Sequence, residues 1–231
     1  MEKAILLGVA AVAPLVIAPL IGTRVRLHKR TTAAILAFAA GTFIAALTFD
    51  LFGTAFEYGG AAAASIGMLL GAAGYILLNQ LVFREVRQRG RRGGTLLLAG
   101  AAIDGVPENV ALGTTLALGT ASAPLLLAIM ISNFPEALVG SEDLRQGKES
   151  SKRIFLTWLA VAAGLVWFVP LGAALGDMNP ATLAAIQSFA AGAVLGLVVD
   201  NMLPQAYEDG GRWVAFATTL GFLVSFLLEQ A

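Results

Sequence analysis

Eight apolar runs, each about as long as a transmembrane helix, make up almost the whole chain and limit what it can fold into. About 20 apolar residues are enough for a helix to cross a bilayer. The runs cover residues 4–22, 33–55, 61–83, 95–118, 123–141, 154–176, 181–206 and 212–230. With 58% hydrophobic and only 13% charged residues, the chain also lacks the polar surface of a soluble domain. We therefore expect an all-α membrane protein, embedded in a lipid bilayer, in which residues 1–231 form a single transmembrane domain.

The basic residues predict how these helices are oriented. Thirteen of the 15 Lys and Arg residues fall in the first, third and fifth connections between runs, and Arg212 stands at the seventh connection, as the first residue of the eighth run. By the positive-inside rule these connections are cytoplasmic. The even number of runs then predicts that both termini are extracytoplasmic. A net charge of +0 offers no electrostatic footprint for a nucleic acid, so we expect no nucleic-acid partner.

A pattern in the second run recurs in the seventh. Each run contains Phe-Ala-Ala-Gly, then an acid, then a glycine pair, as follows: residues 38–41, Asp50 and residues 59–60; residues 189–192, Asp200 and residues 210–211. The two runs cross the membrane in opposite directions, so the repeat is inverted, as in many transporters. Phe-Ala-Ala-Gly alone is equally typical of helix packing. The matched acids and glycines favour a repeat.

Five carboxylates lie inside the apolar runs with no Lys, Arg or His at membrane depth: Asp50, Asp104, Glu108, Glu136 and Asp200. A charged side chain at the centre of the bilayer costs at least about 2.5 kcal/mol. Each carboxylate must therefore be protonated, hydrated in a cavity, or balanced by a bound cation. A cation site explains several of them together, whereas the alternative is that they are protonated packing residues.

Two pairs of polar residues lie at the same depth in neighbouring runs. At about 1.5 Å per helical residue, Asp104 and Glu108 lie about halfway along the fourth run. Ser132 and Glu136 lie about halfway along the fifth. Residues four apart share one helix face, so each pair presents its oxygens together. The spacing predicts a cation site at the midplane, although Ser132 could instead bond to its own helix.

Each pair brackets a proline, Pro107 in the fourth run and Pro135 in the fifth. Proline lacks the backbone donor and breaks the hydrogen-bond pattern one turn earlier. We expect both to act as helix-breaking prolines that free carbonyl oxygens toward a cavity.

Other polar residues surround this predicted site. Asp50 lies near the outer end of the second run and Asp200 near the inner end of the seventh, where they could line the routes by which an ion enters and leaves. Acids near helix ends can equally reach water and have no further role. Further amide oxygens could come from Asn109, Asn133, Asn201 and Gln205. Such side chains also commonly bridge helices.

The motifs Asp104-Gly105-Val106-Pro107-Glu108 and Ser132-Asn133-Phe134-Pro135-Glu136, with residues 189–192 and Asp200, resemble those of the ZIP family of divalent metal transporters. The resemblance covers essentially the whole chain. It implies eight transmembrane helices in a 3+2+3 arrangement, with helices 1–3 and 6–8 as an inverted repeat around helices 4 and 5. It also implies a homodimer in the plasma membrane or bacterial inner membrane, importing metal into the cytoplasm. The metal ligands implied by the resemblance are Asp104, Glu108, Ser132, Asn133 and Glu136, with Asn109 and Asn201 beside them.

The chain departs from the family where the family has histidine. Asp104 replaces the histidine of the fourth helix, and Ser132 replaces the His or Gln of the fifth. Val169 stands before Pro170-Leu171-Gly172, where similar members have Glu, so a second metal position loses a ligand. Oxygen ligands without imidazole make a harder site. The preference should therefore shift from zinc or cadmium toward manganese, iron(II) or magnesium.

These observations favour a transporter whose substrate is zinc, iron(II), manganese or cadmium, and which is not an enzyme and needs no cofactor. The alternative is a non-transporting metal-binding membrane sensor or scaffold whose transport site is impaired. An intramembrane hydrolase using Asp104 and Asp200 as general acid and base is disfavoured, because no Gly-x-Gly-Asp motif occurs in a run.

Overall fold

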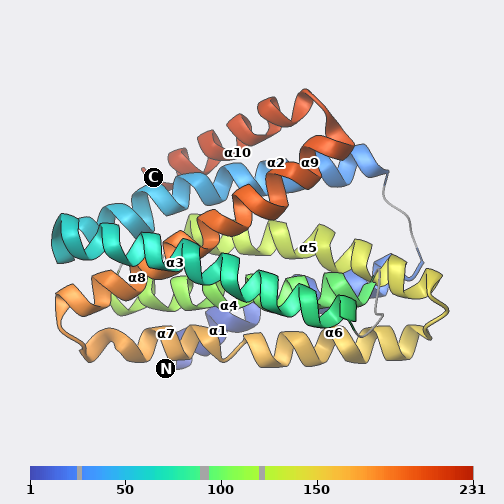
Figure 1. Ribbon diagram of the computed structural model, residues 1–231, viewed down its shortest axis with the longest axis horizontal. Helices are drawn as coiled ribbons and strands as arrows, with labels where there is room; N and C mark the ends of the chain where they lie inside the picture. The colour runs from blue at the N-terminus through green and yellow to red at the C-terminus, as the bar shows by residue number, and fades with distance from the viewer. Residues whose placement is uncertain (25–27, 89–93, 120–122, 231) are drawn as a thin grey trace.

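The protein is helical throughout the part that the structure describes, and most helices run roughly along its long axis (Figure 1). The computed structural model describes the backbone of residues 1–24, 28–88, 94–119 and 123–230, and the side chains of these residues except 83–88 and 94–97. The elements are α1 (Glu2–Gly22), α2 (Lys29–Ala46), η1 (Leu47–Gly53), α3 (Thr54–Gln88), α4 (Gly94–Ala117), α5 (Ala123–Gln146), α6 (Ser151–Leu165), α7 (Phe168–Ala173), η2 (Ala174–Asp177), α8 (Pro180–Leu197), η3 (Val198–Met202), α9 (Leu203–Gly210) and α10 (Trp213–Glu229).

Several helical segments have the length and composition of membrane spans. Within the described residues, 5 segments are long and apolar enough: Glu2–Gly22, Lys29–Val82, Ala123–Gln146, Ser151–Asp177 and Pro180–Gly210. Lys29–Val82 contains two of the expected runs, and Trp213–Glu229 is apolar but shorter. The helical character and the apolar segments agree with the predicted membrane protein. The count of eight spans stays a prediction.

Two glycines reverse the chain at equivalent places. Gly60, with φ 75° and ψ 171°, interrupts α3. Gly211, with φ 62°, separates α9 from α10. Glycine adopts positive φ at little cost because it has no Cβ. The two turns are 151 residues apart.

Close helix packing repeats with the same offset. A Cβ at Gly41 on α2 would overlap the carbonyl oxygen of Thr218 on α10. A Cβ at Gly192 on α8, 151 residues later, would overlap the carbonyl oxygen of Met68 on α3. Small residues let helix backbones approach in this way. The pairs α2–α10 and α8–α3 are therefore equivalent contacts.

Helices α2 and α8 each widen into a π-helical segment beyond this contact. The first is η1 and the second is η3, and their starts, Leu47 and Val198, are again 151 residues apart. At this offset of 151 residues, the residue equivalent to Asp50 is Asn201, whereas the sequence pattern paired Asp50 with Asp200. The acid of the seventh run therefore lies one residue before the position equivalent to Asp50. Single π-helical turns occur frequently at functional sites.

The helices pack as two groups. One group contains α1, α4, α5, α6 and α7, and includes a core around the fully buried Trp158, Leu15 and Leu138. The other contains α2, α3, α8, α9 and α10. The groups meet chiefly where α2 faces α5 and where α8 faces α4.

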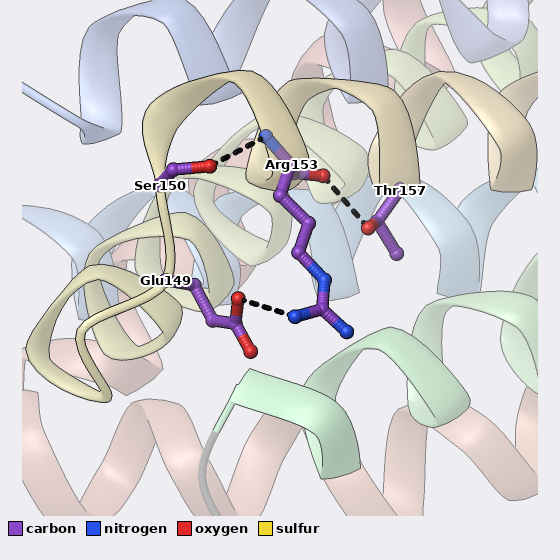
Figure 2. A network of polar contacts seen from close by, with 4 residues as sticks. All are labelled: Glu149, Ser150, Arg153 and Thr157. Carbon is purple, nitrogen blue, oxygen red and sulfur yellow. Dashed lines mark hydrogen bonds and ion pairs between the residues drawn. The ribbon is translucent and has the colours of Figure 1, made fainter.

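The termini and several connections lie toward opposite ends of the molecule. Figure 1 shows both termini toward one end, and the connection between α5 and α6 at the other. At that connection Ser150 Oγ accepts a hydrogen bond from the Arg153 backbone N–H at 3.3 Å (Figure 2). The Arg153 guanidinium pairs with Glu149 at 3.0 Å, and Thr157 Oγ1 donates to the Arg153 carbonyl at 2.8 Å. The basic side chains of residues 26 and 84–92, which the orientation prediction also used, lie outside the described residues.

Candidate cation site

A cavity of about 40 Å³ lies where the two helix groups meet. Its walls come from α2, α4, α5, α8, η3 and α9, through Thr32, Leu36, Asp104, Glu108, Ser132, Pro135, Glu136, Val139, Leu197, Asn201, Met202 and Gln205. This volume is enough for a water molecule or a bare metal ion. The two predicted pairs, Asp104 with Glu108 and Ser132 with Glu136, therefore meet in one cavity.

The carboxylates of this cavity are close enough to affect one another. Asp104 and Glu108 are only 5% and 2% exposed. Glu136 lines the same cavity of about 40 Å³ as these two carboxylates. Within the described part of the chain, no Lys, Arg or His lines the cavity. Buried negative charges this close would repel strongly unless a proton or a cation lies between them.

Glu108 carries an oxygen that protein groups leave unsatisfied. Among the described residues, Glu108 Oε2 is buried without a hydrogen-bond partner. Buried polar atoms in folded proteins are nearly always paired with protein groups, water or ions. Glu108 also lines the cavity, so its side chain lies at the cavity with one oxygen lacking a protein partner among the described residues.

Asp104, by contrast, is held by a neighbouring side chain. Asn201 Nδ2 donates a hydrogen bond to Asp104 Oδ2 at 3.0 Å. The sequence interpretation placed Asn201 beside the site.

The prolines do not break their helices, so that expectation was wrong. Both α4 and α5 continue through Pro107 and Pro135. A proline inside a helix removes a single backbone hydrogen bond. Pro107 removes the bond to the Ile103 carbonyl, and Pro135 removes the bond to the Ile131 carbonyl. The neighbouring helices that pack against α4 and α5 can keep each helix intact despite this loss. Pro135 still lines the cavity, whereas Pro107 is not among its described walls.

Two of the predicted amides donate hydrogen bonds to backbone carbonyls. Asn133 is outside the described lining of the cavity, and its Nδ2 donates to the carbonyl of Ala11 on α1 at 3.0 Å. Asn109 Nδ2 donates to the carbonyl of Gly105 in its own helix at 2.7 Å. The Asn133 contact matches the helix-bridging alternative raised from the sequence, whereas the Asn109 contact does not join two helices. The metal-ligand role of Asn133 stays a prediction.

Ser132 makes a contact of the kind expected for a helical serine. Its Oγ donates to the carbonyl of Ile129 at 3.0 Å. The hydroxyl oxygen keeps its lone pairs, and Ser132 lines the cavity. Ser132 can therefore offer a neutral oxygen while it stays bonded to its helix.

Asp50 and Asp200 lie outside the cavity lining, in contrasting surroundings. Asp50, in η1, is 4% exposed, and its backbone carbonyl accepts a hydrogen bond from Gln187 Nε2 at 3.0 Å. Asp200, in η3, is exposed and accepts a hydrogen bond from Asn79 Nδ2 at 2.8 Å. Their roles along an ion route stay predictions.

The described residues do not form a ready-made metal cluster. No group of three or more His, Asp or Glu side chains in these residues is arranged to hold a metal ion. Asp104, Glu108 and Glu136 share a cavity without converging on one point. Coordination by all three would need side-chain movement, or the neutral oxygens of Ser132, Asn201 and Gln205 as additional ligands.

Part of the cavity wall comes from residues toward one end of the molecule. Thr32, Val139 and Gln205 lie in the parts of their helices nearer the end where α2 begins and α5 and α9 finish. Figure 1 places this end opposite the termini. In the other direction the helices are packed with fully buried apolar side chains, among them Phe43 on α2 and Leu112 on α4.

Comparison with known protein families and with curated proteins finds none that matches the chain. What the site can do therefore follows from its own chemistry, which is that of buried oxygen atoms with a surplus of negative charge.

Proposed function

We propose that the protein is a transporter of divalent metal cations that resembles the ZIP family. The observation that carries this proposal is the cavity in which Asp104, Glu108 and Glu136 meet without a basic partner among the described residues that line it. A divalent cation would neutralise the carboxylates and contact the unsatisfied Glu108 Oε2. The cation is the substrate, and the proposal includes no cofactor.

The chemistry of the cavity walls supports a preference for hard cations. The polar groups that line it offer carboxylate, hydroxyl and amide oxygens. Such ligands suit manganese, iron(II) and magnesium better than they suit zinc or cadmium, which favour nitrogen or sulfur. We expect manganese and iron(II) to be transported ahead of zinc and cadmium.

The proposed architecture has eight transmembrane helices in a 3+2+3 arrangement, with helices 1–3 and 6–8 forming an inverted repeat around helices 4 and 5. The equivalent glycine contacts and glycine turns, 151 residues apart, support this repeat. The distribution of basic residues supports extracytoplasmic termini. From the resemblance to the ZIP family, we also propose that the protein is a homodimer in a plasma membrane or bacterial inner membrane. It would import its substrate into the cytoplasm.

Alternating access is the proposed mechanism, with the cavity opening to each side in turn. The cavity has walls from both helix groups: Asp104, Glu108 and Glu136 belong to one, and Asn201 and Gln205 to the other. A movement of one group against the other would therefore change access to the carboxylates. Within this proposal, the cavity residues Thr32, Val139 and Gln205, which lie toward the end opposite the termini, support an inward-facing arrangement.

Flux through reconstituted liposomes tests the proposal. Manganese, iron(II), zinc, cadmium and magnesium are added outside, and uptake is followed with a metal-sensitive dye inside. Glu136→Gln removes the charge of a cavity carboxylate at nearly constant size, and Glu57→Gln does the same for an exposed acid. We expect flux to be lost with the first variant and retained with the second. Undiminished flux with Glu136→Gln would contradict the proposed site, and binding without flux would favour the sensor or scaffold alternative.

A further inference from the structure

A second cavity lies away from the carboxylates, at the end of the molecule opposite the termini. Its volume is about 450 Å³, and its walls include Arg30, Asp209, Gly211 and Trp213. These residues belong to the start of α2, the end of α9 and the turn into α10, which Figure 1 shows close together. Small-molecule sites usually measure roughly 300–1,000 Å³, so this cavity has room for a ligand.

Two consecutive glycines bring the walls of this cavity together. A Cβ at Gly210 would lie 3.0 Å from the Cβ of Ala33, so the end of α9 packs closely on α2. Gly211 then reverses the chain with φ 62°, and a Cβ there would meet no atom within 4 Å. The close contact brings Asp209 near the start of α2, and the turn leaves open space beside it.

The charges of the cavity favour an anion. Asp209 Oδ1 lies 3.4 Å from Lys29 Nζ, so the acid of the wall already has a cationic partner. Among the described residues, none forms an ion pair with the guanidinium of Arg30. A guanidinium offers five N–H donors in a planar arrangement that suits the oxygens of a phosphate. The cavity therefore presents one unpaired cationic group of the kind that binds phosphate.

The cavity lies at the level where apolar helices end. Both α2 and α10 begin beside it and continue as apolar helices. Trp213 is 80% exposed, and Tyr207 on α9 is 61% exposed. Such aromatic side chains are enriched where membrane lipid headgroups meet water. Arg30 and Trp213 thus combine a charge for a headgroup with an exposed apolar ring for the lipid that carries it.

We propose that this cavity binds the headgroup of an anionic membrane lipid, with the Arg30 guanidinium contacting its phosphate and the Trp213 ring lying against the lipid. Basic pockets between helices on the cytoplasmic side of membrane proteins bind such headgroups. The proposed orientation places the cavity on that side. A free phosphate would use the guanidinium alone, whereas a lipid also covers the exposed ring. This site goes beyond the proposed function, because it requires neither metal binding nor transport.

Native mass spectrometry of the purified full-length protein in detergent tests the site, with phosphatidylglycerol and phosphatidylcholine added at equal concentrations. We expect the protein to retain phosphatidylglycerol in preference. Arg30→Gln should weaken phosphatidylglycerol binding about fivefold and leave phosphatidylcholine binding unchanged. Because Arg30 is exposed, the melting temperature in phosphatidylcholine alone should not change.

Arg24→Gln is the matched control. Arg24 is an exposed arginine at the same end of the molecule, outside the described lining of the cavity. Both substitutions change the net charge equally, so an effect of overall charge would appear in both. We expect wild-type binding of phosphatidylglycerol in Arg24→Gln. Equal losses in the two variants would overturn the proposed site, as would wild-type binding in Arg30→Gln.

Two further measurements sharpen the assignment. Asp209→Asn removes the negative charge from the cavity wall and releases Lys29, so it should tighten phosphatidylglycerol binding. Weaker binding in this variant would contradict the charge argument. Inorganic phosphate, titrated into the lipid-free protein in a calorimeter, should not bind detectably. Phosphate binding that is lost in Arg30→Gln would assign the cavity to a free anion and overturn the lipid assignment.

These outcomes are independent of the cation site. A protein that transports manganese but binds both lipids equally would keep the proposed function and lose the headgroup site. A protein that selects phosphatidylglycerol through Arg30 but neither binds nor transports a divalent metal would keep the headgroup site and lose the proposed function.

Discussion

Gly41 and Gly192 occupy equivalent positions in the two halves of the chain, and each lies against a backbone carbonyl from the opposite half. Gly41 on α2 meets Thr218 on α10, and Gly192 on α8 meets Met68 on α3. The halves are therefore interlocked, since the second helix of each packs with the last helix of the other. This packing builds one of the two helix groups from both halves, and that group supplies Asn201 to the cavity.

This relationship predicts that both glycines are essential for packing. Gly41→Ala and Gly192→Ala would each place a Cβ into a carbonyl oxygen, so the backbones must move apart. Overpacking of this kind typically costs about 1–3 kcal/mol. We expect each variant to lower the melting temperature of the detergent-solubilised protein, with similar effects because the contacts are equivalent.

Gly164→Ala is the control for those variants. Gly164 is exposed within α6, and a Cβ there would meet no atom within 4 Å. Alanine has the higher helix propensity, by about 0.8–1.0 kcal/mol, so this change should be neutral or stabilising. Equal melting temperatures for Gly41→Ala, Gly192→Ala and Gly164→Ala would show that the close contacts do not limit stability.

A second prediction concerns stabilisation by manganese, one of the proposed substrates. A ligand that binds only the folded protein adds about 2.7 kcal/mol of stability at a concentration 100 times its dissociation constant. Manganese should therefore raise the melting temperature, and a chelator should reverse the effect. Glu108→Gln should reduce the shift, because this substitution removes charge from the buried side chain whose Oε2 is unsatisfied. A shift of the same size in Glu108→Gln would place the ion elsewhere.

The third prediction separates two neighbouring residues of α5. Asn133 donates to the Ala11 carbonyl, whereas Ser132 lines the cavity. Asn133→Ala should lower stability by about 0.6 kcal/mol, the average for a hydrogen bond between membrane helices. Ser132→Ala should instead weaken manganese binding with little change in melting temperature. Dialysis and thermal melting of the same two preparations would show whether binding and stability separate in this way.

The meeting of the four cavity residues could be predicted from sequence, for a simple physical reason. Residues four apart share a helix face, and equal depth in neighbouring apolar runs brings two faces to the same level. These two considerations were enough to predict that Asp104, Glu108, Ser132 and Glu136 meet. The recurring glycine pairs, which the sequence analysis used as evidence for a repeat, mark the two glycine turns.

Side-chain direction could not be predicted in this way. Asn133 follows Ser132 directly, and a rotation of about 100° per helical residue turns it toward α1. The one-residue register error between Asp50 and Asp200 had a similar cause. The sequence pattern aligned the two runs on their acids. In the structure, the closely packed glycines show which positions of the two helices are equivalent.

The last prediction concerns metal preference at Asp104, the position where the resembling family has histidine. Asp104→His replaces a hard oxygen ligand with a softer imidazole nitrogen, which zinc and cadmium accept more readily than manganese does. We expect the ratio of zinc to manganese flux in liposomes to rise by about tenfold, equivalent to about 1.4 kcal/mol. Asp104→Asn removes the charge without adding nitrogen coordination, so it should reduce both fluxes and leave their ratio close to that of the wild type. An unchanged ratio in Asp104→His would show that Asp104 does not contact the transported ion.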